Sequence, residues 1–288
     1  MGTTHAPTIN LANGHTMPVI GCGVFRVPPG DETYKSVKTA LELGYRHVDT
    51  AAIYKNEQSV GEAIRDSGLP REQIFVTTKL NTFVQKFTYD ETLQAIRNQL
   101  QKLGMQYVDL YLIHCPRDTA NRVSQWRALI EAQKQGLAKS IGVSDYEVPQ
   151  LKEIADAGLA TPAVLQIEVN PWLAGVRKAE LDHCKQNGIV VQAWGVMAKN
   201  GKDDDSAVAA VAARHPGKTV PDILLKWGLQ MGYVTLTTSR NPAHQQSNLA
   251  AAADSSWQLA HDDMKALASL ANDPFFSMQG SNLSGEKK

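Results

Sequence analysis

The sequence has few cysteines, no excess charge of either sign and no long apolar run. Three cysteines in 288 residues, none closely spaced, exclude a disulfide framework and a zinc-finger site. They predict free thiols in a reducing compartment, so we expect a cytoplasmic protein with no metal. The 29 basic residues balance the 29 acidic ones, which argues against a nucleic-acid partner. No apolar run reaches the length of a membrane span, and residues 1–7 lack the features of a secretory signal.

The glycine-rich fingerprint of open dinucleotide-binding sheets is also missing. Gly21-Cys22-Gly23 is followed by Val24-Phe25-Arg26, so the third glycine of that fingerprint is absent. An open doubly wound sheet therefore stands as the less favoured architecture, and any nucleotide site has to be built in another way.

Short apolar runs alternate with longer helical patterns along the chain. Runs without polar alternation suit strands that are buried on both faces, as in a parallel sheet. The predicted strands are Val19–Gly23, His47–Thr50, Ile74–Lys79, Val108–His114, Ser140–Ser144, Val164–Val169, Val190–Trp194 and Val234–Thr237. The predicted helices are Asp31–Leu43, Glu57–Ser67, Asp90–Leu103, Val123–Gln135, Val148–Ala157, Arg177–Asn187 and Pro221–Met231, with another starting near Pro242. Eight such units without a break in composition predict an α/β protein, a (β/α)₈ TIM barrel, as one domain over residues 1–288.

Three segments fall outside this repeat. Asn13-Gly14 between two short extended stretches favours a two-residue turn, so we expect an N-terminal β-hairpin that caps the bottom of the barrel. Lys202–Asp205 is expected to be a solvated loop. The polar stretch 279–288 contains two glycines and predicts a mobile tail.

Four ionisable side chains stand where predicted strands end. Asp49 ends the second strand, Tyr54 follows it, Lys79 ends the third and His114 ends the fourth. In a barrel these ends meet at one mouth. A lysine beside a tyrosine lowers the pKa of the phenol, and an aspartate holds the lysine charged. A carbonyl between Tyr54 and His114 would be polarised and protonated. Each residue alone has an ordinary structural explanation, so the prediction depends on their convergence.

The segments around these positions resemble the aldo-keto reductase family. The matching motifs are Asp49–Glu57 with Val60–Ile64, Val76–Leu80, Val108–Pro116, Ile141–Ser144 and Leu165–Pro171, and the likeness extends to about residue 270. It is greatest to compact microbial and fungal members such as the diketogluconate reductases. The resemblance implies an NAD(P)H-dependent reductase of aldehydes and ketones. Tyr54 would be the general acid, tuned by Lys79 and Asp49, and His114 would orient the carbonyl.

The resemblance also implies a cofactor site. Its expected residues are Ser144, Asp145, Gln166, Trp194, Gly195, Met197, Ser239, Arg240, His244 and Asn248. Asp145 stands where the family usually has asparagine, and Trp194 where it usually has tyrosine. Thr238 and His244 replace the lysine and arginine that usually bind the 2′-phosphate of NADPH. We therefore expect Arg240 to bind that phosphate, with NADPH as the favoured cofactor and NADH or dual use as the alternative.

The substrate site is expected at the barrel mouth. Its candidates are Val24, Phe25, Asn81, Arg117, Trp172 and the stretch Pro274–Phe276. The expected partner is a small carbonyl compound, with no membrane partner, and the chain would be a monomer or a dimer. The competing hypothesis is a non-catalytic barrel that binds nucleotide as a sensor or channel-associated subunit. The substrate itself cannot be named from the sequence.

Overall fold

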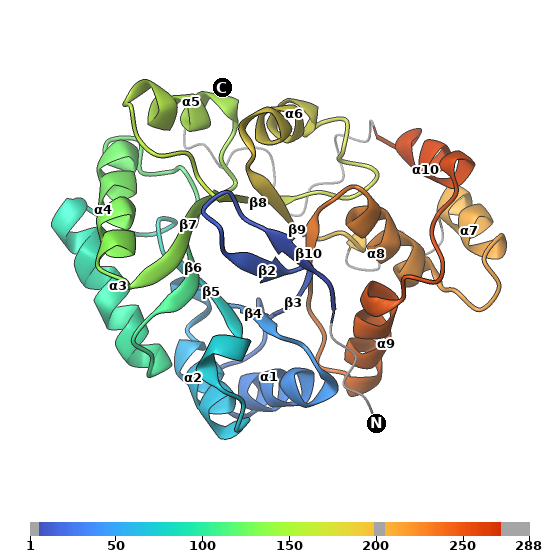
Figure 1. Ribbon diagram of the computed structural model, residues 1–288, viewed down its shortest axis with the longest axis horizontal. Coiled ribbons are helices and arrows are strands. Elements are labelled where there is room, and N and C mark those ends of the chain that lie inside the picture. Colours follow the sequence, from blue (N-terminus) through green and yellow to red (C-terminus); the bar gives the residue numbers. More distant parts are fainter. Residues whose placement is uncertain (1–5, 199–204, 272–288) are drawn as a thin grey trace.

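Eight parallel strands close into a barrel in the computed structural model, which describes residues 6–198 and 205–271 (Figure 1). The strand order around the barrel is β10-β3-β4-β5-β6-β7-β8-β9. The strands are β3 (Ile20–Gly23), β4 (His47–Asp49), β5 (Phe75–Leu80), β6 (Val108–Ile113), β7 (Ala138–Ser144), β8 (Val164–Glu168), β9 (Val190–Trp194) and β10 (Val234–Thr237). All eight predicted strands are confirmed, with small differences at their ends, and the open sheet is excluded because β10 pairs with β3.

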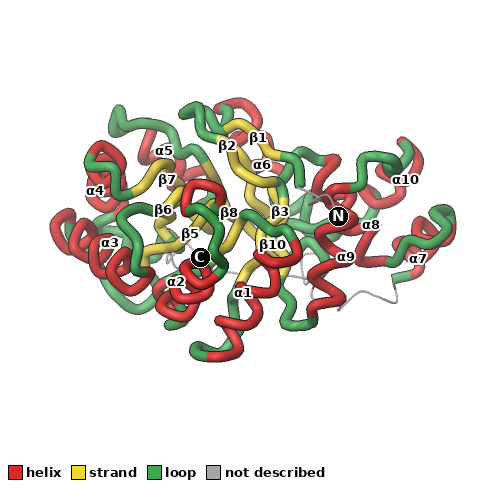
Figure 2. The backbone as a smooth tube through the Cα atoms, turned by 60° about the horizontal axis from the view of Figure 1, so that its bottom comes forward, coloured by secondary structure: helices red, strands yellow, loops and turns green. Residues whose placement is uncertain are grey.

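Helices surround the strands on the outside (Figure 2). Those predicted from the sequence are α1 (Asp31–Leu43), α2 (Glu57–Asp66), α3 (Tyr89–Leu103), α4 (Arg122–Lys134), α5 (Val148–Asp156), α6 (Lys178–Asn187), α8 (Val220–Gln230) and α9 (Pro242–Ala253). Elements that sequence reasoning missed are α7 (Ser206–Ala213), α10 (His261–Ala268) and the short 3₁₀ turns η1 (Ala52–Tyr54) and η2 (Arg71–Gln73). None of the helices in residues 6–198 and 205–271 combines the length and apolarity needed to cross a membrane.

Helix α7 begins where a solvated loop was expected. The carboxylate of Asp205 accepts hydrogen bonds from the backbone N–H groups of Ala207 and Val208, at 3.0 and 3.3 Å. Aspartate at this position satisfies donors that the first helical turn leaves without partners. Asp205 therefore caps a helix, which corrects the expectation for the end of the Lys202–Asp205 segment; residues 202–204 lie outside the described part.

The N-terminal hairpin covers one end of the barrel, as predicted. Strands β1 (Thr8–Asn10) and β2 (Thr16–Pro18) pair antiparallel and lie across the barrel in Figure 1. Met17 is fully buried in a cluster with apolar residues at the strand starts, including Phe75 and Val234. The Asn13 side chain donates to the Ser140 hydroxyl at 2.9 Å. The hairpin thus closes the N-terminal end and leaves the opposite end, at the strand C-termini, for a site.

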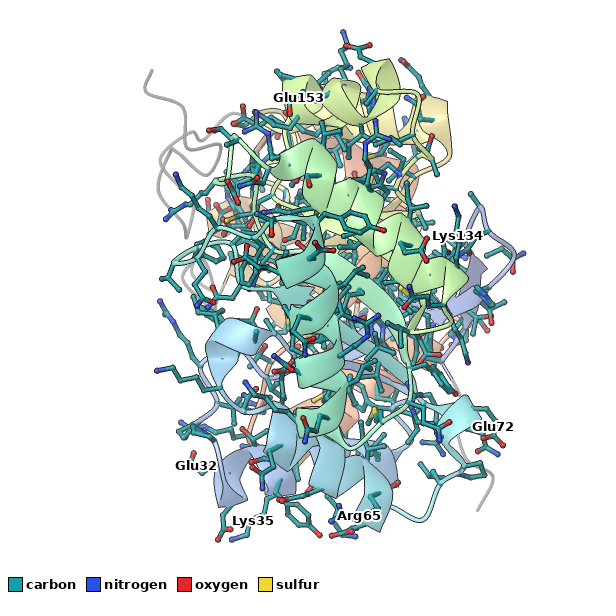
Figure 3. The ribbon with its side chains drawn as sticks, turned by 90° about the vertical axis from the view of Figure 1, so that its left-hand side faces the viewer. Glu32, Lys35, Arg65, Glu72, Lys134 and Glu153 are labelled. Carbon is teal, nitrogen blue, oxygen red and sulfur yellow. The ribbon has the colours of Figure 1, made fainter. Side chains whose placement is uncertain are left out.

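The outer helices carry the charged side chains. Figure 3 shows them from the side, with Glu32 toward the mouth, Glu72 toward the hairpin end, and Lys35 and Arg65 at the outer surface.

Helix α2, which follows the Tyr54 turn, lies in backbone contact with the end of α3 at Gly61. A Cβ atom added at Gly61 would lie 2.0 Å from the Leu103 carbonyl oxygen. We therefore expect Gly61→Ala to lower the free energy of unfolding by about 3 kcal/mol, since backbone cannot move aside as a side chain can. Urea unfolding measures this, with Gln58→Ala on the exposed face of α2 as the control. A Gly61→Ala protein as stable as the control would contradict the helix packing described here.

Candidate active site

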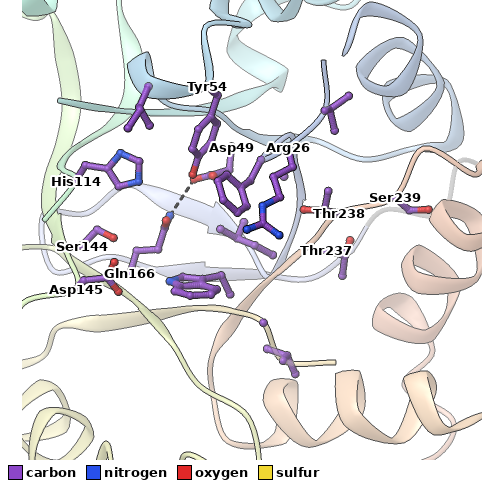
Figure 4. A pocket seen from close by; sticks show the side chains of 18 of the residues that line it. Arg26, Asp49, Tyr54, His114, Ser144, Asp145, Gln166, Thr237, Thr238 and Ser239 are labelled. Carbon is purple, nitrogen blue, oxygen red and sulfur yellow. Dashed lines mark hydrogen bonds between the residues drawn. The ribbon is translucent and has the colours of Figure 1, made fainter. Parts of the chain in front are cut away.

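A cavity of about 630 Å³ opens at the C-terminal ends of the strands (Figure 4). Its walls come from the C-terminal parts of the strands, β8 included, and from the loops after the other seven strands. They include Gly23, Phe25, Arg26, Asp49, Tyr54, Phe83, His114, Arg117, Ser144, Asp145, Gln166, Trp194, Gly195, Met197, Thr237, Thr238, Ser239 and Arg240. In Figure 4, Tyr54, His114 and Gln166 surround one part of the cavity, and Thr237, Thr238 and Ser239 lie at the other.

A buried ion pair lies at the base of this cavity. The Lys79 amine, which is inaccessible to solvent, donates to Asp49 Oδ1 at 2.6 Å and to the Thr50 carbonyl oxygen at 2.8 Å. The other oxygen of Asp49 accepts from Gln166 Nε2 at 2.9 Å. Burial lowers the pKa of Lys79, and the charge of Asp49 offsets part of that shift. The carboxylate thus connects β4, β5 and β8 beneath the site.

Tyr54 stands above this pair on the turn η1. The Lys79 amine lies 5.1 Å from the centroid of the Tyr54 ring. Burial, together with the charges of Asp49 and Asp145, raises the pKa of Tyr54 well above its ordinary value. Lys79 therefore does not bring this pKa below its ordinary value, as was expected, because burial and the charges of Asp49 and Asp145 act in the opposite direction. Tyr54 is a neutral phenol that holds its proton.

His114 faces Tyr54 across the cavity. The two ring centroids are 5.7 Å apart and the rings meet edge to face. Burial, and then the charge of Lys79, lower the pKa of His114 well below its ordinary value, so the imidazole is neutral. Its Nδ1 atom is buried and has no hydrogen-bond partner among the described residues. A neutral imidazole has one N–H to donate, which suits a carbonyl oxygen placed between the two rings.

Most of the predicted cofactor residues share the walls of this cavity. Ser144 ends β7 and Asp145 follows it, Gln166 lies in β8, and Trp194 ends β9. Asp145 has a φ of 54°, in the left-handed region, and its backbone N–H donates to the Gln166 carbonyl oxygen at 2.9 Å. Gly195, Met197, Ser239 and Arg240 also line the cavity. The structure therefore gathers residues from four strands that are far apart in the sequence.

Two of the predicted cofactor-binding residues do not line this cavity. His244 and Asn248 are on α9, where His244 is exposed and Asn248 is buried, and neither lines the wall. Arg240 lines it, but its guanidinium forms an ion pair with Glu32 in the first turn of α1. Nothing in the sequence indicated this pair, whose members are 208 residues apart.

Of the predicted substrate residues, some line the cavity and others do not. Phe25 and Arg117 line the cavity. Val24 is buried in the core, and Trp172 is buried with its indole N–H donating to Asp205 at 2.9 Å. Asn81 lines a separate hollow beside α3. These three residues are therefore absent from the cavity wall, and Pro274–Phe276 lie outside the described residues.

Sequence reasoning missed several residues of the wall, among them Arg26 and Phe83. Arg26 has a φ of 60°, and its guanidinium carbon lies 5.1 Å from the Phe25 ring centroid. Phe83 packs edge to face on His114, with ring centroids 4.8 Å apart. Their position directly after the first and third barrel strands was the available signal, since all such loops face the mouth.

Comparison with known proteins gives one consistent result. The model of the Aldo/keto reductase family matches residues 20–272. An aldo-keto reductase of Mycobacterium sp. (strain MCS) is 41% identical over 266 residues, covering 92% of this chain and 90% of the relative. A glyoxal reductase of Bacillus subtilis (strain 168) is 40% identical over 239 residues, covering 83% and 84%. The structure of a Bombyx mori aldo-keto reductase in complex with NADP aligns with a TM-score of 0.84 at 29% identity, covering 98% and 99%.

The neutral state of His114 predicts how stability depends on pH. The folded protein keeps this imidazole uncharged, whereas the unfolded chain protonates it below about pH 6.5. The unfolded state then binds more protons, so the free energy of unfolding falls as the pH drops below that value. We expect His114→Gln to reduce this slope by up to about 1.4 kcal/mol per pH unit.

Urea unfolding of both proteins at several pH values below neutrality measures the two slopes. His183→Gln, a change on α6 at a histidine outside the cavity wall, is the matched control. Equal slopes for the protein and the His114→Gln variant would show that His114 is charged or accessible in the folded state.

Proposed function

Because this chain belongs to the aldo/keto reductase family, we propose that it reduces the carbonyl group of aldehydes or ketones to alcohols, with Tyr54 as the proton donor. The observation that carries the proposal is the convergence of Tyr54, His114 and the Lys79–Asp49 pair on one cavity. The competing hypothesis, a non-catalytic nucleotide-binding barrel, is less favoured because binding alone requires no phenol beside a buried lysine.

In this proposal the protein binds the carbonyl oxygen between two neutral donors. His114 donates its N–H and polarises the carbonyl, and Tyr54 gives its proton to the oxygen as negative charge develops there. A bound nicotinamide cofactor would supply the hydride to the carbonyl carbon. The phenolate that remains on Tyr54 lies beside the Lys79 ammonium, whose attraction stabilises it in a site of low dielectric. Asp49 fixes the ammonium in that position.

The residues at the end of β7, in β8 and at the end of β9 fit a nicotinamide ring. Gln166 uses its side-chain N–H groups on Asp49 and Gln192, at 2.9 and 2.6 Å, so its side-chain oxygen is left as an acceptor for a carboxamide NH₂ group. Ser144 offers a hydroxyl beside it. Trp194 offers a flat aromatic surface at the cavity wall, suited to stacking on the ring.

We propose NADPH as the cofactor, with NADH or dual use as the alternative. The NADP complex of the Bombyx mori relative supports a nicotinamide cofactor of this kind. Arg240 and Ser239 lie at the cavity end formed by β10, and the N-terminus of α9 begins just beyond them. Glu32 favours the alternative, because its carboxylate competes for Arg240 and repels a phosphate.

The role of Tyr54 is tested by Tyr54→Phe, which removes one hydroxyl and keeps the ring. Loss of a general acid costs about 100-fold or more in rate, so kcat for aldehyde reduction should fall by at least that factor. Tyr34→Phe on α1, whose hydroxyl donates to Asp66 at the surface, is the matched control. A Tyr54→Phe enzyme that keeps more than a tenth of the activity of the control would exclude Tyr54 as the proton donor.

The role of Arg240 is tested by cofactor affinity. Glu32→Gln should strengthen NADPH binding relative to NADH, and Arg240→Ala should weaken it, each by up to about fivefold, since exposed ion pairs are worth up to about 1 kcal/mol. Quenching of tryptophan fluorescence by each nucleotide gives the Kd values without turnover. Glu42→Gln, farther along α1, is the control. An unchanged ratio of the two Kd values in both variants would place the 2′-phosphate elsewhere.

A further inference from the structure

Two pairs of phenylalanine and arginine flank the carbonyl-reducing part of the cavity. The Phe25 ring lies 5.1 Å from the Tyr54 ring, between centroids, and carries the Arg26 guanidinium at 5.1 Å. On the other side, the Phe83 ring lies 4.8 Å from the His114 ring and carries the Arg117 guanidinium at 5.0 Å. Each ring proposed to contact the carbonyl is thus backed by a second ring that holds a cation.

Neither of these two cations is neutralised. Arg26 and Arg117 form no ion pair with any residue in the described part of the chain, whereas Arg240 pairs with Glu32. A guanidinium stacked on an aromatic face keeps its N–H groups at the edge available for acceptors. Because Phe83 holds the Arg117 guanidinium on its face, less side-chain freedom is lost when an anion binds there.

The nearest acidic residue in sequence does not offset the charge of Arg117. Asp118 is buried, and its carboxylate accepts hydrogen bonds from the Phe87 N–H at 3.0 Å and from Gln125 Nε2 at 2.8 Å. It stabilises the loop beneath the cavity instead. Of the carboxylates in the wall, Asp49 is paired with Lys79, and Asp145 is buried at the end of β7. Neither of these two wall carboxylates nor Asp118 forms an ion pair with Arg117 in the described part of the chain.

The two arginines stand at different places around the barrel, and this determines which part of a bound cofactor or substrate each one faces. Arg26 follows β3, the neighbour of β10, and in Figure 4 it lies between Tyr54 and Thr238, toward the proposed phosphate end. Arg117 follows β6, which is four strands from β10 in either direction around the barrel. A cofactor whose phosphates lie at the β10 end leaves Arg117 on the opposite side of the barrel, three residues after His114 and so on the side of the proposed carbonyl site.

We propose that this site selects carbonyl compounds that carry a carboxylate, and that Arg117 binds this carboxylate while Tyr54 and His114 hold the carbonyl oxygen. This inference depends on the proposed carbonyl reduction and adds the substrate class. A planar guanidinium matches a carboxylate with two parallel hydrogen bonds, which a neutral group cannot provide. A hydrogen bond between charged groups is worth about 1.5–3 kcal/mol, so the preference should be about 10- to 100-fold.

The test compares two aldehydes that differ in charge but hardly in shape, 4-carboxybenzaldehyde and the neutral 4-formylbenzamide. Steady-state reduction by the enzyme with NADPH should give a kcat/KM at least about tenfold higher for the carboxylate, mainly through KM. Arg117→Gln should bring the ratio close to one, and Arg117→Lys should restore part of it, because the charge returns without the planar fork. Each ratio is measured within one protein, so differences in the folded fraction cancel.

Arg65→Gln, an exposed change on the outer face of α2, is the control and should keep the wild-type ratio (Figure 3). A wild-type enzyme that reduces both aldehydes equally well, or an Arg117→Gln enzyme that keeps the full preference, would overturn the inference while carbonyl reduction stands. Failure of the wild type to reduce either aldehyde would overturn the proposed function, and this inference with it.

Discussion

The ion pair between Lys79 and Asp49 is the constraint around which the mouth of this barrel is arranged. Both side chains are almost completely removed from water, and the desolvation of two charges is costly unless further hydrogen bonds accompany the pair. Here the Thr50 carbonyl oxygen and the Gln166 amide provide them. Removing either charged partner would leave the other buried and unpaired. The pair therefore fixes the relative positions of β4, β5 and β8 as well as the chemistry above it.

Burial, and after it the charges of this pair and of Asp145, keeps both Tyr54 and His114 neutral. The positive charge of Lys79 opposes protonation of His114, and the negative charges of Asp49 and Asp145 oppose ionisation of Tyr54. Burial favours the uncharged form of both rings, since it lowers the pKa of His114 and raises that of Tyr54. Two uncharged donors at the mouth suit a reaction in which negative charge develops on an oxygen, because they stabilise that charge without requiring a charged group in the ground state. The further cations, Arg26 and Arg117, remain at the rim.

The barrel, the hairpin and the meeting of Asp49, Tyr54, Lys79 and His114 at one cavity could be predicted from the sequence, because each depends on local patterns and on one topological rule. Apolar runs identify strands buried on both faces, and parallel strands in a barrel direct their C-terminal ends to one mouth. The missed helix α7 is apolar along most of its length, so it lacks the 3.6-residue period that distinguishes a helix, and its cap at Asp205 resembled a charged loop. The aldo-keto resemblance is confirmed by the family match.

The features that could not be predicted depend on the direction in which a side chain points and on partners that are far apart in the sequence. Val24 and Phe25 are neighbours, but one side chain enters the core and the other the cavity, which the sequence does not distinguish. Arg26 reaches the wall from a left-handed backbone conformation that nothing in its sequence context requires. The Arg240–Glu32 pair joins α1 to the loop after β10. Burial, together with the charges of Asp49 and Asp145, raises the pKa of Tyr54, where a lowering by Lys79 was expected.

The central claim is that Tyr54 is held as a neutral acid by its surroundings and not converted to a phenolate by Lys79. Its most direct test is the near-ultraviolet difference spectrum between the protein and its Tyr54→Phe variant, recorded during titration from about pH 7 to about pH 10, the ordinary tyrosine pKa. The account predicts no phenolate absorbance from Tyr54 over this range. A titration step equivalent to one tyrosine with a midpoint below about pH 9 would contradict it.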